Sequence, residues 1–210
     1  MMIVSWTTLI KFTSPIKAFF LWRIIIIMQK SNKSFIIVGD PHLNHSRVST
    51  RIDDISLTAL EKLDTMADIA AYLCKIYDAN YDLLITGCLL HDLGKIIELE
   101  GPIVYKYSLE GKLLGHISIM VAELKKAAEE LKITSEVPLL LEHMVLSHHG
   151  QPDFGSPVLP STKEALLLSL IDNLDSKMVV VNKAIADVEP GNFSNKVFPL
   201  DNRAFYKPKN

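Results

Sequence analysis

The sequence predicts a mainly α-helical protein, and two observations carry this prediction. Apolar residues recur three or four positions apart over residues 56–77, and they do so again in later stretches near 113–131, 137–149 and 161–187. Hydrophobic residues make up 49% of the 210 residues, which is enough to fill the core of one domain.

The N-terminal third begins without a clear pattern and then becomes helical. Residues 1–34 have no regular period, whereas 35–38 are β-branched or aromatic and favour a short strand. The helical spacing starts at residue 56, just after two acidic residues of the kind that a helix N-terminus favours. Residues 83–90 are largely apolar, and over eight positions the pattern leaves both a helix and a buried strand open.

Three further helices are expected in the second half of the chain. The first begins near Leu113, and the second spans 137–149 and ends before a glycine. Ser161 and Glu164 have the spacing of a capping box, which would open a last helix reaching about Asp187.

Charge, cysteine content and hydropathy limit the binding partners and the cellular compartment that we expect for the protein. The formal net charge of −2 provides no overall basic field for nucleic acid. Cys74 and Cys88 form neither a disulfide framework nor a metal-binding pair, which favours the reducing cytoplasm. The apolar run 18–28 contains Arg23 and is well short of the roughly 20 residues that span a bilayer. We therefore expect a cytoplasmic protein without a membrane anchor.

The most informative motif is the pair His91-Asp92, followed by Gly94 and Lys95. An imidazole and a carboxylate side by side suit Mn, Fe, Zn, Ni or Co ions better than Ca or Mg. Such an ion polarises a phosphoryl oxygen and activates water, so metal-assisted phosphoester hydrolysis is the first hypothesis. Gly94 offers a turn just past the pair, and Lys95 brings a cation close to it.

Several downstream residues are candidate ligands or supporting groups. Asp172 shares a helical face with core residues, where a carboxylate without a partner would cost several kcal/mol. Adjacent residues of a helix diverge by about 100°, so only one of His148 and His149 is expected to face the metal. The other would contact a ligand or the substrate. The candidates of this region are His116, His143, His148, His149, Asp172 and Asp175.

The region from residue 89 resembles the HD domain of YhaM-type 3′-5′ exoribonucleases. The matching stretches are LLHDLGKIIELEGP at 89–102, YSLEGKLLGHISIMV at 107–121, LSHHGQPDFGSPVLP at 146–160, LIDNLDSKM at 170–178 and VFPLDNRAFYKP at 197–208. Together they cover nearly all of residues 89–210, far more than the His-Asp pair alone.

This resemblance implies a fold, a division of the chain and an activity. The fold is an HD-domain helical bundle over 55–188, after a partly β segment 1–54 and before an extended tail, 189–210, packed on the domain. The activity is metal-dependent trimming of single-stranded RNA, and of some DNA, from the 3′ end. Mn²⁺ is the favoured ion, with Co²⁺, Fe²⁺ or Ni²⁺ as alternatives. A homo-oligomer is left open.

The same resemblance assigns roles residue by residue. Asp92 would bridge two ions, Lys95 would steady the phosphate, and Asp172 is preferred over Asp175 as a ligand. The implied metal ligands are His91, Asp92, His116, His148 and Asp172, with Asp92 and Lys95 as the catalytic pair. His143, His149 and Asp175 are expected to support ligands or contact substrate.

One departure and one second resemblance complicate this picture. HD domains take a first histidine from the helix before the His-Asp pair, where this chain has Lys62. Residues 35–88 resemble the start of a calcineurin-like metallophosphoesterase, with Asp40 and His42 as its Asp-x-His motif. We therefore consider a chimera joined near 86–91. The alternative is a diverged HD protein that resembles phosphoesterases by chance.

The leading functional hypothesis is a 3′-5′ exoribonuclease-like phosphodiester hydrolase, impaired if Lys62 replaces a ligand. Two alternatives stay open. One is a non-catalytic remnant that binds metal or nucleotide, and the other is a nucleotide phosphohydrolase of the wider HD superfamily.

Overall fold

The computed structural model describes residues 65–100 and 106–209, and these residues confirm the mainly α-helical prediction. The only paired strands within these ranges are two short antiparallel ones, β1 (Leu99–Glu100) and β2 (Lys106–Tyr107), with Leu99 opposite Tyr107. A helix at 65–77 comes first. The elements after it are α3 (Tyr81–Leu90), α4 (Lys95–Glu98), β1 (Leu99–Glu100), β2 (Lys106–Tyr107), α5 (Leu109–Glu130), α6 (Val137–Ser147), the 3-10 turn η2 (Pro152–Phe154), α7 (Lys163–Ile185) and the 3-10 turn η3 (Phe198–Leu200).

Polar side chains cap the starts of three helices. The side chains of Asn80, Ser108 and Thr162 accept backbone N–H groups of α3, α5 and α7, which satisfies donors that a helix start leaves free. The expected capping box is therefore wrong in its residues, because Thr162 is the cap in place of Ser161. Glu164 instead accepts the backbone N–H of Asn80 at 2.7 Å and so ties the start of α7 to the start of α3.

Other boundaries differ from the expected ones for local reasons. Residues 83–90 are helical rather than extended. Helix α5 begins four residues before Leu113 because Ser108 caps it there. Helix α6 stops at Ser147, two residues earlier than expected, so His148 and His149 stand beyond its end. The apolar run 18–28 and the expected strand 35–38 lie outside the described residues.

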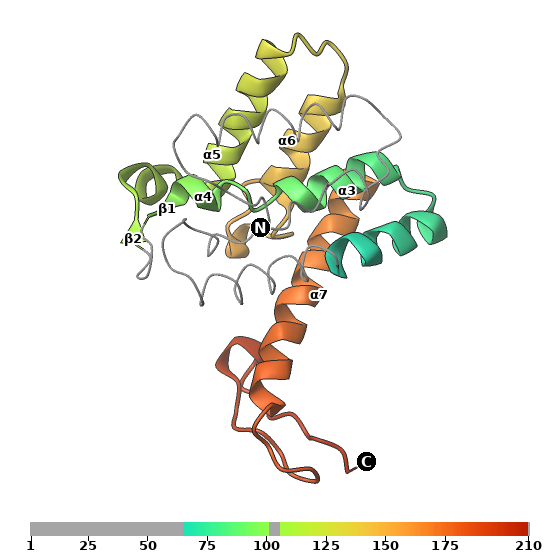
Figure 1. The fold of residues 1–210 in the computed structure, drawn as a ribbon, viewed down its shortest axis with the longest axis vertical. Helices are drawn as coiled ribbons and strands as arrows, with labels where there is room; N and C mark the ends of the chain where they lie inside the picture. Colours follow the sequence, from blue (N-terminus) through green and yellow to red (C-terminus); the bar gives the residue numbers. More distant parts are fainter. Residues whose placement is uncertain (1–64, 101–105, 210) are drawn as a thin grey trace, which may run out of the picture.

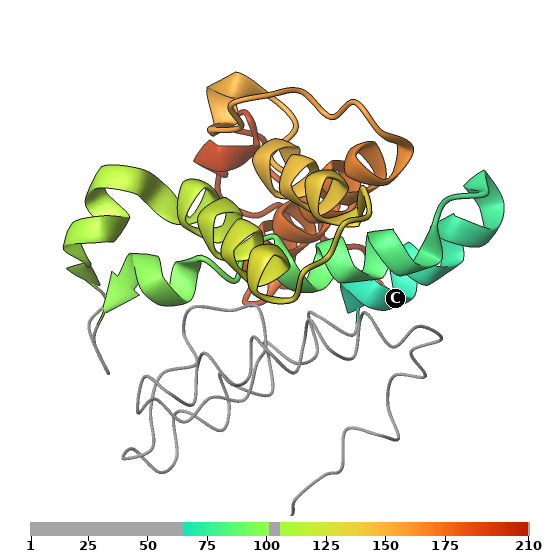
Figure 2. The same cartoon turned by 90° about the horizontal axis from the view of Figure 1, so that it is seen from above.

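The described helices pack around one apolar core (Figures 1 and 2). Helix α5 packs against α4 and α6, and α3 packs against α6 and α7. Side chains from four of the helices are fully buried where these contacts meet: Leu84, Cys88, Leu90, Leu124, Leu141, Met144, Val145, Leu168 and Ile171. None of the described helices combines the length and the apolar character that crossing a bilayer requires.

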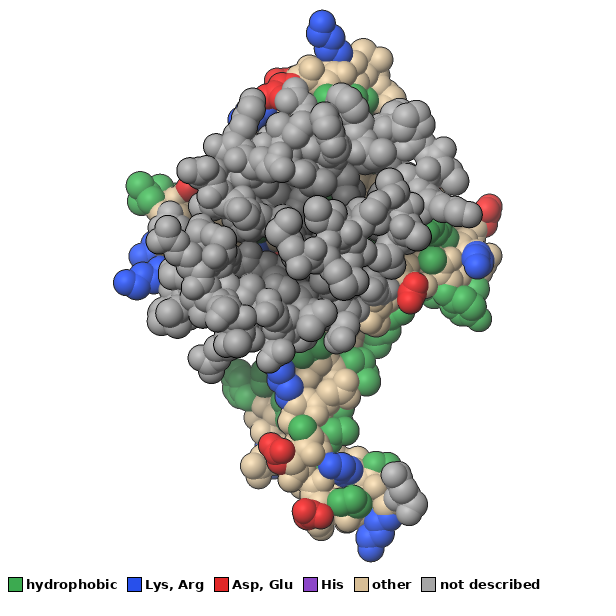
Figure 3. Space-filling model, in the orientation of Figure 1, with side chains coloured by type: hydrophobic (Ala, Val, Ile, Leu, Met, Phe, Trp, Pro, Cys, Tyr) green, Lys and Arg blue, Asp and Glu red, His purple; other side chains and the backbone are tan. Residues whose placement is uncertain are grey.

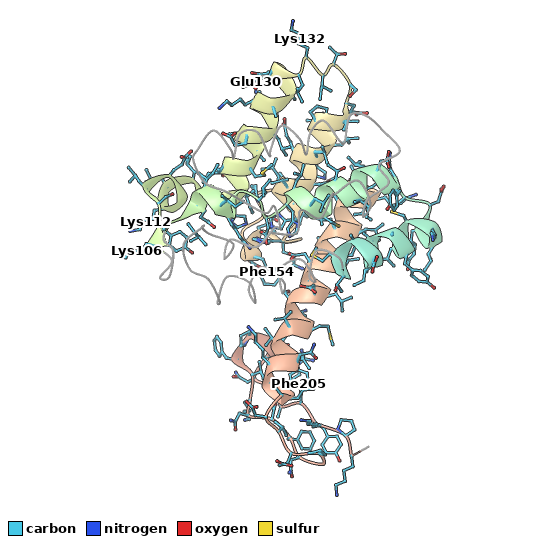
Figure 4. All side chains as sticks on the ribbon, viewed as in Figure 1. Lys106, Lys112, Glu130, Lys132, Phe154 and Phe205 are labelled. Carbon is cyan, nitrogen blue, oxygen red and sulfur yellow. The ribbon has the colours of Figure 1, made fainter. Side chains whose placement is uncertain are left out.

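Helix α7 extends well beyond the bundle, and the C-terminal tail folds at its far end (Figure 1). Two isolated bridges, Phe193 with Tyr206 and Val197 with Arg203, close the tail into an irregular hairpin. Figure 4 shows Phe205 beside the end of α7, where Lys207 donates a hydrogen bond to the carbonyl of Ala186. The tail therefore contacts the protruding part of α7, whose surface carries apolar side chains (Figure 3).

Candidate metal centre

The five residues predicted as metal ligands come together although they belong to four separate elements. His91 follows the last residue of α3, Asp92 stands in the turn before α4, His116 lies in α5, His148 follows α6, and Asp172 lies in α7. Packing of α3 and α5 against α6, and of α3 against α7, brings these ends and faces to one place.

Asp92 stands at the centre of the group, and its two carboxylate oxygens face different neighbours. Oδ1 lies 3.6 Å from Nε2 of His116 and 3.8 Å from Nε2 of His148. Oδ2 lies 3.6 Å from Nε2 of His91 and accepts a hydrogen bond from Nζ of Lys95 at 2.6 Å. Asp92 therefore joins two clusters of polar atoms.

Asp172 of α7 completes the second cluster, which lies on the Oδ2 side of Asp92. Nε2 of His91 lies 3.8 Å from Oδ1 of Asp172, so this imidazole stands between two carboxylates. Burial raises the pKa of Asp172, which the nearby His91 partly opposes. A cation placed among these groups would relieve the unfavourable burial of that charge.

Three of the imidazoles present the same nitrogen to the centre of the group. Nδ1 of His91 lies 2.8 Å from the carbonyl oxygen of Cys88, and Nδ1 of His148 lies 2.7 Å from that of Val145. A carbonyl only accepts hydrogen bonds, so each Nδ1 carries the proton and each Nε2 keeps a lone pair. Nδ1 of His116 faces the Glu98 carboxylate at 3.3 Å, which leads to the same arrangement.

Four buried atoms at this place have no hydrogen-bond partner within the described residues. They are Oδ1 of Asp92, Nε2 of His116, Nε2 of His148 and Nδ1 of His149. Buried polar atoms in native proteins are nearly always paired. One oxygen and three imidazole nitrogens also form a donor set that suits transition metals. Because metal–nitrogen and metal–oxygen bonds are about 2.1 Å long, neighbours 3.6–3.8 Å apart fit around a shared ion.

The electrostatics also suit a divalent cation. Burial opposes ionisation of Asp92, but the neighbouring His91 and the charge and hydrogen bond of Lys95 outweigh it and hold the pKa of Asp92 well below its usual range. Burial, helped by the nearby His91 and His149, lowers the pKa of His148 to about 3. At neutral pH the carboxylate is thus charged and this imidazole is neutral, which are the forms that bind metals.

His149 belongs to the cluster, which differs from the supporting role expected for it. The candidate ligand atoms of His116, His148 and His149 all lie within 4.8 Å of one another. The ring centroids of His148 and His149 are only 4.1 Å apart. The expected divergence applies inside a helix, but α6 ends at Ser147 and the backbone turns there. Gly150, with φ of 79°, was the sequence feature that marked this turn.

The two other supporting candidates lie elsewhere. Nε2 of His143 accepts the backbone N–H of Ser161 at 2.9 Å and so holds the segment before α7. Asp175 follows Asp172 by three residues on α7, and within the described residues it joins neither cluster. The remaining candidates, Asp40, His42 and Lys62, lie outside the described residues.

Two residues near the centre have roles that sequence reasoning missed. Glu98 is buried against His116, and the only hint in the sequence was one acidic residue in an apolar run, IIEL. Gly94 lies in the expected turn, although its φ of −58° is open to any residue. It is required for another reason, because a Cβ there would overlap the backbone of His116.

Comparisons with known proteins agree with this architecture. The sequence model of the HD domain family matches residues 63–177. The chain is 53% identical over 145 residues to a protein named 3′-5′ exoribonuclease YhaM from a Geobacillus strain, covering 69% of this chain and 45% of that protein. It is 46% identical over 182 residues to the YhaM of Bacillus licheniformis, covering 87% of this chain and 56% of that protein. No solved structure matches significantly.

These matches also bear on the N-terminal half of the chain. The family match begins at residue 63, so the join considered at 86–91 falls inside it. The alignment with the Bacillus licheniformis protein covers 87% of the chain and therefore takes in most of residues 35–88. Both findings favour one HD protein over a chimera. The chain spans about half the length of the curated relatives that it matches.

The cluster of candidate ligands at the junction of α3, α5, α6 and α7 agrees with a family match over more than half of the residues. This chain belongs to the HD domain family.

Proposed function

We propose that the chain is a metal-dependent phosphodiester hydrolase that removes nucleotides from the 3′ end of single-stranded RNA, and less readily of single-stranded DNA. The observation that carries the proposal is the set of four buried, unpartnered atoms on Asp92, His116, His148 and His149. The names of the YhaM relatives support the substrate class and the direction.

In this proposal, Asp92 is shared between two ion positions. Its Oδ1 would act with His116, His148 and His149, and its Oδ2 with His91 and Asp172. Divalent ions held there would polarise the phosphoryl group and help to ionise water. Mn²⁺ is our first choice because imidazole and carboxylate ligands are mixed, and Co²⁺, Fe²⁺ and Ni²⁺ suit the same set.

Lys95 has two consequences for such a site. Its ammonium group is partly exposed and bonded to Oδ2 of Asp92, so it holds that carboxylate in place. When a phosphodiester enters, the same group would be free to pair with a phosphate oxygen. Lys95→Met should then lower turnover by about tenfold, as expected for one charged hydrogen bond of roughly 1.5 kcal/mol.

A second candidate function rests on Lys62. A lysine stands where the HD resemblance expects a histidine, which favours a protein that binds metal or nucleotide without turnover. Lys62→His separates the two candidates. An inactive wild-type chain that becomes active after this change is an impaired exoribonuclease, and one that stays inactive is a binding protein.

The central experiment joins metal analysis to a substrate panel. The purified chain is analysed for bound metal and then incubated with Mn²⁺ and 5′-labelled single-stranded RNA. Stepwise shortening that a blocked 3′ end prevents is expected. Hydrolysis of nucleoside triphosphates or cyclic dinucleotides with the RNA left intact would instead indicate a nucleotide phosphohydrolase. Asp92→Asn serves as the inactive control.

The cellular compartment and the division of the chain into segments are part of the same proposal. Both cysteines are free and buried, which supports the cytoplasm as the compartment. We propose that residues 55–188 form the catalytic unit, with 1–54 and 189–210 as accessory segments. A homo-oligomer is left to measurement by light scattering.

A further inference from the structure

Glu98 is a buried carboxylate for which the proposed function has no role so far. It ends α4 and is 9% exposed. Burying a carboxylate is costly unless it is bonded. Its partner among the described residues is His116, whose backbone N–H donates to Oε1 at 3.1 Å and whose Nδ1 lies 3.3 Å from both oxygens.

The chain departs from regular helix geometry to make this contact. Gly115 interrupts α5 with φ of 70° and ψ of 156°, a region that is essentially restricted to glycine. The interruption frees the N–H of His116 from the helical hydrogen-bond pattern, and Glu98 accepts it. The carboxylate thus caps the helical segment that starts at His116, where the helix dipole favours a negative charge.

Two glycines let the elements come this close. A Cβ at Gly111 would overlap the backbone of Glu98, and a Cβ at Gly94 would overlap the backbone of His116. The separation of Glu98 and His116 is therefore set by backbone packing on both sides. It does not depend on a flexible surface side chain.

The contact with Glu98 determines which nitrogen of the His116 imidazole carries the proton. An ionised carboxylate only accepts hydrogen bonds, so Nδ1 of His116 must carry the proton. Nε2 then keeps its lone pair, and it faces Oδ1 of Asp92 at 3.6 Å. His91 and His148 obtain the same tautomer from backbone carbonyls, so His116 alone of the three relies on a charged acceptor.

We propose that Glu98 is a positioning residue, which fixes the tautomer and orientation of His116 and thereby strengthens binding of a divalent cation. This inference rests on the metal-dependent function proposed above. A carboxylate behind a ligating histidine makes the imidazole a better donor, and loss of such a partner costs about 10–100-fold in metal affinity.

The first test uses the unaltered protein without metal. Two-dimensional ¹H–¹⁵N NMR of the imidazole rings at neutral pH reports which nitrogen of each histidine is protonated, and His116→Gln assigns the signal. We expect the Nδ1–H form for His116. A predominant Nε2–H form would overturn the inference, whether or not the chain hydrolyses RNA.

The second test measures Co²⁺ affinity from the visible absorption of the bound ion. Glu98→Gln keeps the size of the side chain and an oxygen for the His116 N–H but removes the charge. We expect binding about 10–100-fold weaker, with the helical circular dichroism unchanged. Glu98→Asp keeps the charge and should recover part of the loss. Glu129→Gln, exposed on α5, the helix that carries His116, is the matched control and should bind as the wild type does.

The outcomes separate this inference from the proposed function. If Glu98→Gln binds Co²⁺ as tightly as the wild type, the positioning role is refuted even when RNA is hydrolysed. If the wild type binds Co²⁺ but leaves RNA intact, the proposed activity fails while the affinity comparison still decides the role of Glu98. A wild type that binds no Co²⁺ refutes the function and the affinity effect together.

Discussion

Nε2 of His116 lies 3.6 Å from Oδ1 of Asp92, and neither buried atom has a hydrogen-bond partner in the described part of the chain. The separation is too long for a hydrogen bond. Each atom therefore loses its bond to water on folding and gains no bond to protein, which costs about 1–3 kcal/mol per group. A cation shared by the two atoms would offset this cost, so metal content and stability should be coupled.

Removal of metal should therefore lower the melting temperature. A ligand at about 100 times its Kd stabilises a protein by roughly 2.7 kcal/mol. For a domain of this size that corresponds to a shift of about 5–10 °C. Scanning calorimetry with and without a chelator measures the shift, and Mn²⁺ should restore the original value better than Ca²⁺ does. An unchanged melting temperature would mean that no ion occupies the cluster.

Asp172→Asn and Asp175→Asn form a matched pair on α7. Only Asp172 lies beside His91, at 3.8 Å, so its substitution should remove about one equivalent of bound metal per chain. Burial raises the pKa of Asp172, so losing the charge should leave the metal-free protein at least as stable. Elemental analysis and urea unfolding test both statements. Equal metal loss in the two variants would contradict the geometry.

His149→Gln and His143→Gln compare a histidine inside the candidate metal site with one outside it. Nδ1 of His149 is unpartnered and close to the other candidate ligands, so its loss should weaken Co²⁺ binding by about tenfold or more. His143 instead accepts a hydrogen bond from Ser161, and its loss should cost about 1 kcal/mol of stability with metal affinity unchanged. Titration with Co²⁺ and urea unfolding distinguish the variants, and the reverse pattern would exclude His149 from the site.

The helices and most of the cluster could be predicted from the sequence because both depend on local patterns. Apolar spacing reports directly which face of a helix is buried, and this held for α5, α6 and α7. The His-Asp pair and its downstream partners matched a family pattern. Such signals can be recognised in a sequence without knowing how the helices pack.

The features that could not be predicted from the sequence depend on contacts between segments that are far apart in the chain. Nothing in the sequence pattern announces a break at Gly115, since apolar residues stand on both sides of it, Leu113 and Leu114 before and Ile117 after. The break makes sense only once Glu98 is seen beside His116. The convergence of His148 and His149 likewise follows from where α6 ends, and single residues at a helix end are the least predictable part of a pattern.

The metal-free protein should lose stability as the pH falls below about 6.5. Burial lowers the pKa of His148 to about 3 from 6.5, so between these values the unfolded chain binds the extra proton. Stability is thus fully present above pH 6.5 and declines toward pH 3, by roughly 2 kcal/mol between pH 7 and pH 5. The lowered pKa of His116 acts in the same direction, and the raised pKa of Asp172 opposes it nearer to pH 4.

Urea unfolding of the metal-free chain at pH 7, 6 and 5 measures this dependence. His148→Gln removes the titrating group and should flatten the profile, whereas His143→Gln should leave the slope as it is. A wild-type profile that is flat, or that rises toward pH 5, would show that His148 is not held neutral by burial.

The last prediction concerns two glycines that differ in what surrounds them. A Cβ at Gly94 would overlap the backbone oxygen of His116 and lie 2.9 Å from its carbonyl carbon. Backbone cannot move aside without shifting the ligand, and displacements of about 1 Å are large for a preorganised site. Gly94→Ala should therefore weaken Co²⁺ binding by about tenfold or more.

A Cβ at Gly87 would instead meet the flexible end of Met144. Gly87→Ala should cost about 1–3 kcal/mol of stability through overpacking, partly offset by better helix propensity, with metal affinity kept. Co²⁺ titration of both variants decides the matter, and equal affinities would show that the close approach at Gly94 does not position His116.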